Sequence, residues 1–414
     1  MAVLLGITIL VGTACGTTAP PAPPPPPPLL PVAVDVPADT AALVAADDRF
    51  GVDLLTAPGV PATGNLAMSP ASVAVALQMV AAGARGATAA QLSHVLHLPS
   101  AAAAATSAQA LLAGLSAAGH DSHTTLRVAN TVWAQRGMTL APAYRDVLNS
   151  RFGAAMHTAD FQADPAGARQ AVNRTVAGQT GGMVPELFPP GSLDSSTRMV
   201  LADAVYLAAS WARAFPVRDT APGPFTLADG SVVRVPMMHA QPAPDAPAYG
   251  FAAGPGYQAV TLPYTGGKLA FTMLLPTGTS LTPVLDALRD NGLPAILRAV
   301  RPSGVSLAMP RFAVRSALDL TTVLAGLGMP VAFSDAADFG GISGEPLRIQ
   351  TVRHDAVVRV DEHGTTAAAA TGVGMQASAA VVSRVVTVDH PFLFVITDIA
   401  TGAPLFLGRI TDPR

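Results

Sequence analysis

The sequence predicts an α+β domain built around β-sheet, with helical and extended segments mixed along the chain. Some segments have apolar residues at helical spacing, among them 38–56 with Leu43, Phe50 and Leu54. Others alternate apolar and polar residues as strands do, and one such pair flanks Asp229-Gly230, a strong hairpin signal. The 414 residues, 50% of them hydrophobic, are enough for one large core or two ordinary ones.

Composition excludes several classes of function. The net charge of −3 gives no general attraction to nucleic acid or to anionic membranes. The single cysteine, Cys15, excludes an intrachain disulfide and a zinc cluster built from thiolates, and the nine histidines have no metal-binding spacing. No catalytic or phosphate-binding motif is present, so we expect neither an enzyme nor a cofactor.

The N-terminal part is expected to be an export signal and a spacer. Residues 2–14 are apolar but too short to span a bilayer, and small residues precede Cys15, so 1–15 resemble a bacterial lipoprotein signal in which Cys15 receives the lipid. Residues 16–37 contain a run of prolines from Pro23 to Pro28 and are interpreted as a semi-rigid spacer, with a proline-motif ligand as the alternative. The folded domain is expected over 38–414, at the outer face of the cell membrane or secreted.

The folded part begins with helical signals. After the helix over 38–56 and a short strand at 65–68, Ser69 and Pro70 are suited to the N-cap and the first residue of a second helix. Thr88 is expected to cap a third helix that continues to Leu96. Further helices are predicted at 166–178 and 318–324, and further strands at 126–135, 225–238, 258–264, 268–275, 305–310 and on both sides of Thr401-Gly402.

One stretch, 358–371, begins as a strand and then loses every large side chain. From Gly364 to Thr371 it contains only Gly, Thr and Ala, so it has little apolar surface to hold it in a core as a loop. It also lacks proline, and Thr365, Ala367 and Ala369 would share one face if it became a strand. It could therefore be a loop that converts to a central strand; an Ala-rich flexible linker is the alternative.

The same stretch, GTTAAAAT preceded by Val360, Asp361 and Glu362, resembles the proximal hinge of the reactive loop in serpins, the serine protease inhibitors. The run NLAMSPASVAVALQMVAAGARGATAAQL, the run LGMPVAFSDAADFGGIS and the C-terminal HPFLFVITDIATGAPLFLGRITDP are similar to segments of that family. The resemblance covers residues 38–414. It implies a large central, mostly antiparallel sheet, further sheets, about eight or nine helices and an exposed reactive loop.

The resemblance also implies a function. A serpin traps a serine protease as an acyl-enzyme by inserting the cleaved loop into its sheet as a new strand. We therefore expect a monomeric inhibitor of serine proteases, with cysteine proteases as a second class of partner. A non-inhibitory serpin that acts as a binding or structural protein is the alternative. The hinge implied by the resemblance is Glu362, Gly364, Thr365, Thr366, Ala367, Ala368, Ala369 and Ala370.

Two further groups correspond to family positions. Ser69, Ser72, Asp203 and His354 correspond to the "shutter", where the large sheet opens, and a core polar network without a switching role is the alternative. Trp211 corresponds to the tryptophan of the "breach", where the loop first enters, although a large aromatic residue is also simply core. The family usually has Asn where this chain has Asp203. Because a carboxylate cannot donate a hydrogen bond, we expect it to favour a protonated His354 and hypothesise pH-sensitive sheet opening.

The reactive bond must lie beyond the hinge. Counting from Glu362 places the residue before the scissile bond at Ser378, whereas counting back from Pro391 favours Ala380. The window Gln376, Ala377, Ser378, Ala379 and Ala380 suits a shallow pocket, so an elastase-like or subtilisin-like protease is favoured. The bond between Arg384 and Val385, which would suit a trypsin-like enzyme, is the alternative.

Overall fold

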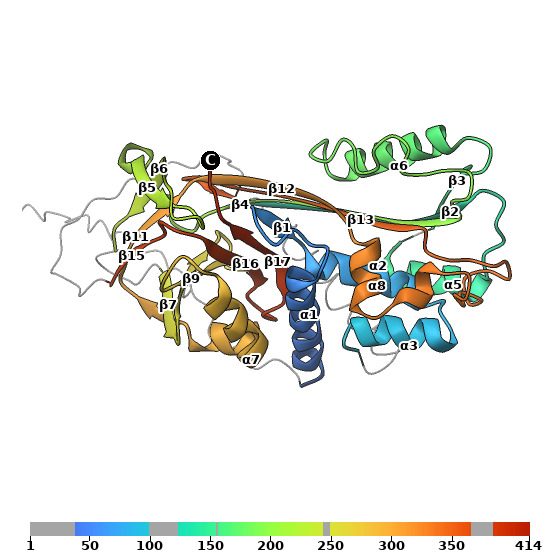
Figure 1. Cartoon of the computed structure of the whole chain (residues 1–414), viewed down its shortest axis with the longest axis horizontal. Coiled ribbons are helices and arrows are strands. Elements are labelled where there is room, and N and C mark those ends of the chain that lie inside the picture. Colours follow the sequence, from blue (N-terminus) through green and yellow to red (C-terminus); the bar gives the residue numbers. More distant parts are fainter. Residues whose placement is uncertain (1–37, 99–122, 155, 243–248, 366–383) are drawn as a thin grey trace, which may run out of the picture.

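Three β-sheets form the body of the protein, and helices cover their faces and ends (Figure 1). The computed structural model describes residues 38–98, 123–154, 156–242, 249–365 and 384–414. From edge to edge, the six-stranded sheet consists of β12 (Phe312–Asp319), β13 (Thr351–Val360), β14 (Gly364–Thr365), β4 (Met199–Ser210), β2 (Thr124–Gln135) and β3 (His157–Ala159). The predicted α+β class is confirmed.

The other two sheets are antiparallel except at one edge. The seven-stranded sheet consists of β1 (Leu66–Met68), β17 (Pro404–Ile410), β16 (Phe392–Asp398), β9 (Leu269–Pro276), β8 (Tyr257–Pro263), β7 (Tyr249–Gly254) and β10 (Arg301–Ser303). The four-stranded sheet consists of β15 (Arg384–Thr387), β11 (Val305–Pro310), β6 (Val232–Ala240) and β5 (Ala221–Thr226), and β15 pairs with β11 in parallel.

Seven α-helices lie in the described residues, where about eight or nine were expected for the whole chain. They are α1 (Ala38–Thr56), α2 (Pro70–Ala81), α3 (Gly86–Val95), α5 (Pro142–Val147), α6 (Pro165–Gln179), α7 (Thr282–Ala299) and α8 (Thr321–Leu327). Short turns of other helix types occur at η1 (Leu148–Phe152), η2 (Val217–Asp219) and η3 (Pro330–Phe333). None of the helices in these ranges is long and apolar enough to cross a membrane.

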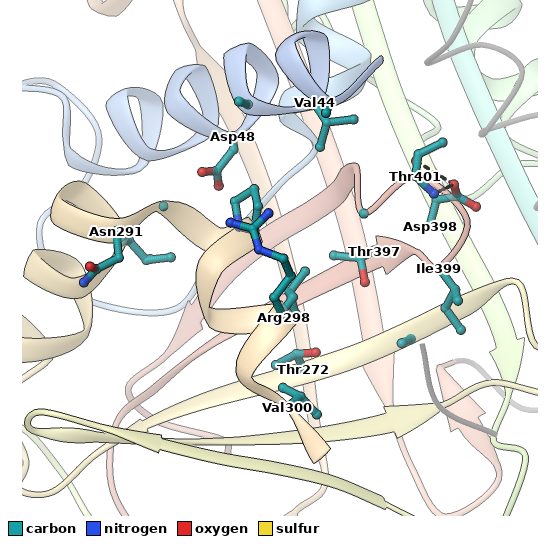
Figure 2. A pocket seen from close by; sticks show the side chains of 18 of the residues that line it. Val44, Asp48, Thr272, Asn291, Arg298, Val300, Thr397, Asp398, Ile399 and Thr401 are labelled. Atoms are coloured by element: carbon teal, nitrogen blue, oxygen red, sulfur yellow. Dashed lines mark hydrogen bonds between the residues drawn. The ribbon is translucent and has the colours of Figure 1, made fainter. Parts of the chain in front are cut away.

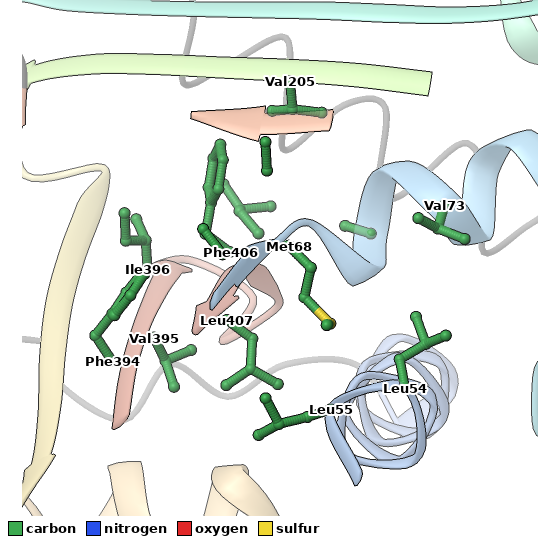
Figure 3. Close-up of a cluster of buried hydrophobic side chains, with 14 of the residues drawn as sticks. Leu54, Leu55, Met68, Val73, Val205, Phe394, Val395, Ile396, Phe406 and Leu407 are labelled. Atoms are coloured by element: carbon green, nitrogen blue, oxygen red, sulfur yellow. The ribbon is translucent and has the colours of Figure 1, made fainter. Parts of the chain in front are cut away.

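Helix α2 passes through the middle of the core. As the sequence predicts, Ser69 is its N-cap, with its hydroxyl accepting from the amide of Ser72 at 3.3 Å, and Pro70 is its first residue. All its residues are buried, because β17 lies on one side of it and β2 and β4 of the six-stranded sheet on the other. Figure 3 shows the apolar side chains that meet around it, from α1, β1, the six-stranded sheet and the C-terminal strands.

The six-stranded sheet is covered on both faces. One face packs on the main core, where Val205 of β4 lies close to the C-terminal strands. Helix α6 covers the opposite face, and its Val172 and Val176 bury against a second cluster that includes Tyr206 and Val357 (Figure 1). Its central strands are therefore buried on both sides, which explains why β4 is almost continuously apolar.

Most outer strands of the three sheets are short or contain proline. Strands β1, β3 and β10 have three residues each, and β15 has four. Strand β5 carries Pro222 and Pro224, which have no backbone N–H to donate. These edges therefore offer few free backbone donors to another chain.

Most local predictions are confirmed, and two are wrong. The first helix spans the predicted 38–56, and the hairpin at Asp229-Gly230 joins β5 and β6. Thr88 is not a cap, because α3 already begins at Gly86 and the Thr88 hydroxyl accepts from the amide of Asp338 at 2.9 Å. Leu318 is not helical, because β12 continues to Asp319 in pairing with β13, and α8 begins only at Thr321.

A cavity of about 610 Å³ lies between α1, α7 and the strands β8, β9 and β16 (Figure 2). Asp48 of α1 lines it and accepts a hydrogen bond from the amide of Leu293 at 3.0 Å. Burial raises the pKa of the Asp48 carboxyl to about 6. Burial also raises the pKa of its neighbour Asp47. The folded protein therefore holds protons on this helix that the unfolded chain would release.

We predict that Asp48 makes stability fall as the pH rises. Its folded pKa lies above the unfolded value, so its contribution is complete below about pH 4 and is lost towards pH 6. From pH 4 to 7 the free energy of unfolding should fall by roughly 2–3 kcal/mol through this group. Asp48→Asn keeps an acceptor for Leu293 but cannot ionise, so it should remove that fall. Urea unfolding at pH 4, 5.5 and 7 tests this, with the exposed Asp290→Asn as control; parallel pH curves for Asp48→Asn and wild type would contradict it.

Candidate functional site

A seam runs through the six-stranded sheet where β13 and β4 lie side by side. They pair in parallel, from Thr351 opposite Val200 to Val357 opposite Tyr206, although the other pairings of β4 within the sheet are antiparallel. Beyond Val357 a third strand, β14, lies between them, and Thr365 pairs with both Val360 of β13 and Ala209 of β4. The seam is thus closed along most of its length and already holds two residues of an additional strand at one end.

Gly364 can occupy this position only because it has no side chain. An added Cβ would lie 2.0 Å from the carbonyl oxygen of Ala209, which is backbone and cannot move aside cheaply. Thr365 follows with its side chain fully buried, and its hydroxyl lies 2.5 Å from that of Tyr264. The chain therefore turns from β13 into the gap at Gly364 and inserts Thr365 into the core.

Glu362 holds the base of this turn. Its carboxylate is buried and accepts hydrogen bonds from the Arg311 guanidinium and the Thr220 hydroxyl, the latter at 2.6 Å. Burial raises the pKa of the Glu362 carboxyl, but the bonds from Arg311 and Thr220 outweigh it and hold that pKa below the usual value. The ionised carboxylate therefore stabilises the closed arrangement.

Trp211 lies directly beneath the turn. Its indole Nε1 donates to the carbonyl of Asp361 at 2.9 Å, and its amide donates to the carbonyl of His363 at 2.8 Å. The indole stacks on Tyr264 with 4.6 Å between ring centroids and meets Phe271 edge-on. Trp211 is thus both part of the core and a direct partner of the chain that enters the sheet.

A polar cluster crosses the seam farther along. His354 of β13 lies opposite Asp203 of β4, which in turn lies opposite Asn130 of β2. At the start of α2, the Ser72 hydroxyl donates to Asp203 at 2.7 Å and Asn130 donates to the Ser72 carbonyl at 2.9 Å. The amide of Ser69 donates to Nε2 of His354 at 3.0 Å. The four residues named from the sequence are therefore together and buried, and Asn130 joins them.

The Ser69 amide determines which nitrogen of His354 carries the proton. Because Nε2 accepts this hydrogen bond, a neutral ring holds its proton on Nδ1, which lies 3.4 Å from Oδ2 of Asp203. A doubly protonated ring would have to give up the bond from Ser69. The geometry thus sets the tautomer of a neutral ring, and the protonated form expected from the sequence stays a prediction.

Part of the predicted site falls outside the described residues. This applies to Thr366, Ala367, Ala368, Ala369 and Ala370 of the hinge, to the reactive window 376–380 and to Cys15. The alternative bond after Arg384 is described: Arg384 and Val385 lie in β15, paired with Val305 and Ser306 of β11, and the Arg384 guanidinium lies 4.6 Å from the centroid of the Phe251 ring. A bond held in a sheet is a poor protease substrate, so the structure argues against that alternative.

Sequence reasoning missed four partners of the site. Thr220, Tyr264 and Asn130 gave no local signal, because their contacts join segments from 58 to 142 residues apart along the chain. Arg311, which lies 51 residues before Glu362 in the chain, gave no local signal either. In the described part of the chain, no group of three His, Cys, Asp or Glu side chains is arranged to hold a metal ion.

The described fold joins a sheet with a parallel central seam to a two-residue strand at one end of that seam. Comparisons with known proteins give its family: the family model Serpin (serine protease inhibitor) matches residues 45–413. The leukocyte elastase inhibitor of Bos taurus is 35% identical over 90% of this chain and 99% of its own length. An uncharacterized serpin-like protein of Thermococcus kodakarensis is 35% identical over 84% and 81%.

Solved structures agree. Uncleaved ovalbumin superposes with a TM-score of 0.79 at 26% identity, covering 90% of this chain and all of the other. The thermophilic serpin tengpin in its native state gives 0.80 at 23% identity, which shows the fold alone. The chain belongs to the serpin family, whose members are described as serine protease inhibitors and not as enzymes, and the relative from Bos taurus is named an inhibitor.

We predict that Glu362→Gln loosens the hinge at neutral pH. The folded pKa is lowered, so the carboxylate stabilises the fold above about pH 4.5, and this contribution is lost as the pH falls through the lowered value. At pH 7 the variant should lose about 1–3 kcal/mol of unfolding free energy, and little at pH 3. Urea unfolding between pH 3 and 7 measures this, with the exposed Glu345→Gln as control. An equal loss at both pH values would show that the charge is not the cause.

The hypothesis of pH-sensitive sheet opening stays a prediction. We expect the rate at which the cleaved loop inserts, followed by tryptophan fluorescence, to change several-fold between pH 5 and 8 in wild type. In Asp203→Asn the rate should change less, because the amide lacks the charge that faces His354. Superimposable profiles of the two proteins would exclude this role for the pair.

Proposed function

We propose that this protein is a suicide-substrate inhibitor of serine proteases. The observation that carries the proposal is β14: Gly364 and Thr365 already lie between β13 and β4, and the chain beyond them consists of small residues. Because Thr365 faces the core, a continued strand would also turn Ala367, Ala369 and Thr371 inward, and each of these is small enough for a crowded sheet.

In the proposed mechanism the protease is trapped halfway through its own reaction. Its serine attacks the carbonyl carbon of a bond near Ser378, an ester forms, the amide bond breaks and the C-terminal side leaves as a free amine. The released hinge then enters the seam and pairs on both sides. Backbone pairing and burial gained along about a dozen residues are worth on the order of 10 kcal/mol, which drags the acyl-enzyme away before water can hydrolyse the ester.

The favoured target is an elastase-like or subtilisin-like protease. Residues 376–380 read QASAA and contain only one side chain larger than serine, so they suit a protease with a shallow specificity pocket. The relative from Bos taurus is named a leukocyte elastase inhibitor, which agrees with this class. Cysteine proteases are a second class to test, and a non-inhibitory serpin acting as a binding protein remains the alternative function.

We further propose that the protein acts outside the cell, as a monomer. The apolar run before Cys15 and the proline-rich spacer support export, with a lipid on Cys15 holding the domain at the outer face of the membrane. Mass spectrometry of the membrane fraction tests the lipid. If the protein carries no acyl chain, the lipid anchor is excluded and secretion without an anchor is the location that remains.

The central experiment is denaturing gel electrophoresis after mixing the protein with elastase, subtilisin or trypsin, with mass spectrometry of the released peptide. We expect a covalent band and a peptide that begins between Ala379 and Val381. Clean cleavage by every enzyme, without a covalent band and without a higher melting temperature afterwards, would favour the non-inhibitory alternative.

We predict that Thr365→Arg converts the inhibitor into a substrate. The Thr365 side chain is fully buried beside Tyr264, so a charged residue cannot dock there without a large desolvation cost. Cleavage should proceed at the wild-type rate, while the covalent complex falls at least tenfold by gel densitometry. Arg359→Lys on the exposed side of β13 serves as control. A variant that traps protease as well as wild type would show that Thr365 does not take part in insertion.

A further inference from the structure

The side chain of Tyr264 is a fixed, buried hydroxyl at the mouth of the seam. Tyr264 follows β8 and bridges to Trp211, and its own amide donates to the carbonyl of Leu269 at 3.0 Å. The phenol ring stacks on the Trp211 indole with an angle of 10° between the planes, and it is fully buried. The hydroxyl therefore has one position, set by parts of the fold that do not belong to the loop.

The hydrogen-bond partner of this hydroxyl in the described part of the chain is the hydroxyl of Thr365. Burial raises the pKa of the Tyr264 phenol, so it stays neutral and remains available as a donor. If the hinge withdrew, a polar group would be left in an apolar pocket, and such groups are costly unless they are hydrogen-bonded. The closed pocket thus favours a small residue with a hydroxyl at position 365.

We propose that Tyr264 is a positioning residue that docks the hinge through Thr365, so that insertion of the loop grows from a strand that is already started. This inference rests on the proposed inhibitory function and names the residue that sets its first step. Starting a strand between two others fixes several residues for few bonds, whereas each later residue adds bonds to an ordered end. Because Gly364 and Thr365 are already docked before a protease binds, the entropy cost of starting the strand does not fall on the insertion step.

The contact should matter for the rate and not for the final state. Thr365 already faces inward, and a strand that continues from β14 leaves it where it is. The bond to Tyr264 therefore exists before and after insertion. Without this bond the hinge can leave the gap between β13 and β4. Insertion must then begin again from an undocked loop, and hydrolysis of the acyl-enzyme competes with it.

The test uses Tyr264→Phe, Thr365→Val and the double variant of the full chain. Each single variant removes one hydroxyl and keeps the shape of the side chain. Two quantities are measured: the share of protein that ends as covalent complex with a serine protease, and the rate at which the loop inserts after cleavage, followed by tryptophan fluorescence. Tyr257→Phe is the matched control, because this buried tyrosine lies at the opposite end of β8 from Tyr264, beside Gly254.

We expect each single variant to slow insertion about three- to tenfold, with a matching rise in cleaved protein that forms no complex, and the double variant to be no slower than the slower single one. Multiplied effects in the double variant would show that the two hydroxyls act separately, as a merely structural role predicts, and would overturn the docking role. Wild-type rates in Tyr264→Phe would overturn it as well.

The two proposals can fail separately. If wild type is cleaved without forming a complex, but its melting temperature still rises after cleavage, inhibition is wrong and the insertion rates still decide the role of Tyr264. If the cleaved wild-type protein gains no thermal stability, its loop does not insert, and both proposals are wrong.

Discussion

The parallel contact between β13 and β4 is the constraint on which the rest of the structure depends. Its two strands come from segments about 150 residues apart and pair directly through their backbones from Thr351 to Val357, with the polar cluster of Asp203 and His354 across the same line. Parallel pairs are slightly weaker per residue than antiparallel ones, so this line and the short β2–β3 pair at the edge are the weaker pairings of the six-stranded sheet. Helix α2 packs on one face of this line and α6 on the other, so both shield it from solvent. Any strand that entered between β13 and β4 would therefore have to form backbone hydrogen bonds with both of them.

The polar cluster gives the seam a second property. Asp203 and His354 lie directly opposite each other across it. Because neighbouring strands are about 4.8 Å apart, a strand inserted between them would double their separation and break their contact. Ser69, the N-cap of α2, contacts His354, and Ser72 in the first turn of α2 contacts Asp203. The cluster therefore joins both strands of the seam to the start of the helix below it.

The sequence predicts the parts of this arrangement whose causes are local. Ser69-Pro70 and Asp229-Gly230 act within a few residues, and both were recognised correctly. Thr88 was misjudged because its hydroxyl serves a backbone amide 250 residues away. Tyr264, Arg311 and Thr220 could not be found for the same reason: each is an ordinary core or surface residue until folding brings the hinge to it. The family resemblance indicates which residues form the hinge, whereas the residues that contact it are found only from the tertiary structure.

Under the proposed function, a protein whose sheet takes up one further strand faces a problem that an ordinary sheet protein does not. Any extended segment with small side chains, including one from another molecule, could compete for the place of that strand or attach to an outer edge. Pro222 and Pro224 on β5 and the very short β1, β3 and β10 withhold backbone donors at those edges. These edges therefore offer little for self-association. In the proposed mechanism, the strand that inserts is then selected at the seam, whose mouth is filled by the protein's own Gly364 and Thr365.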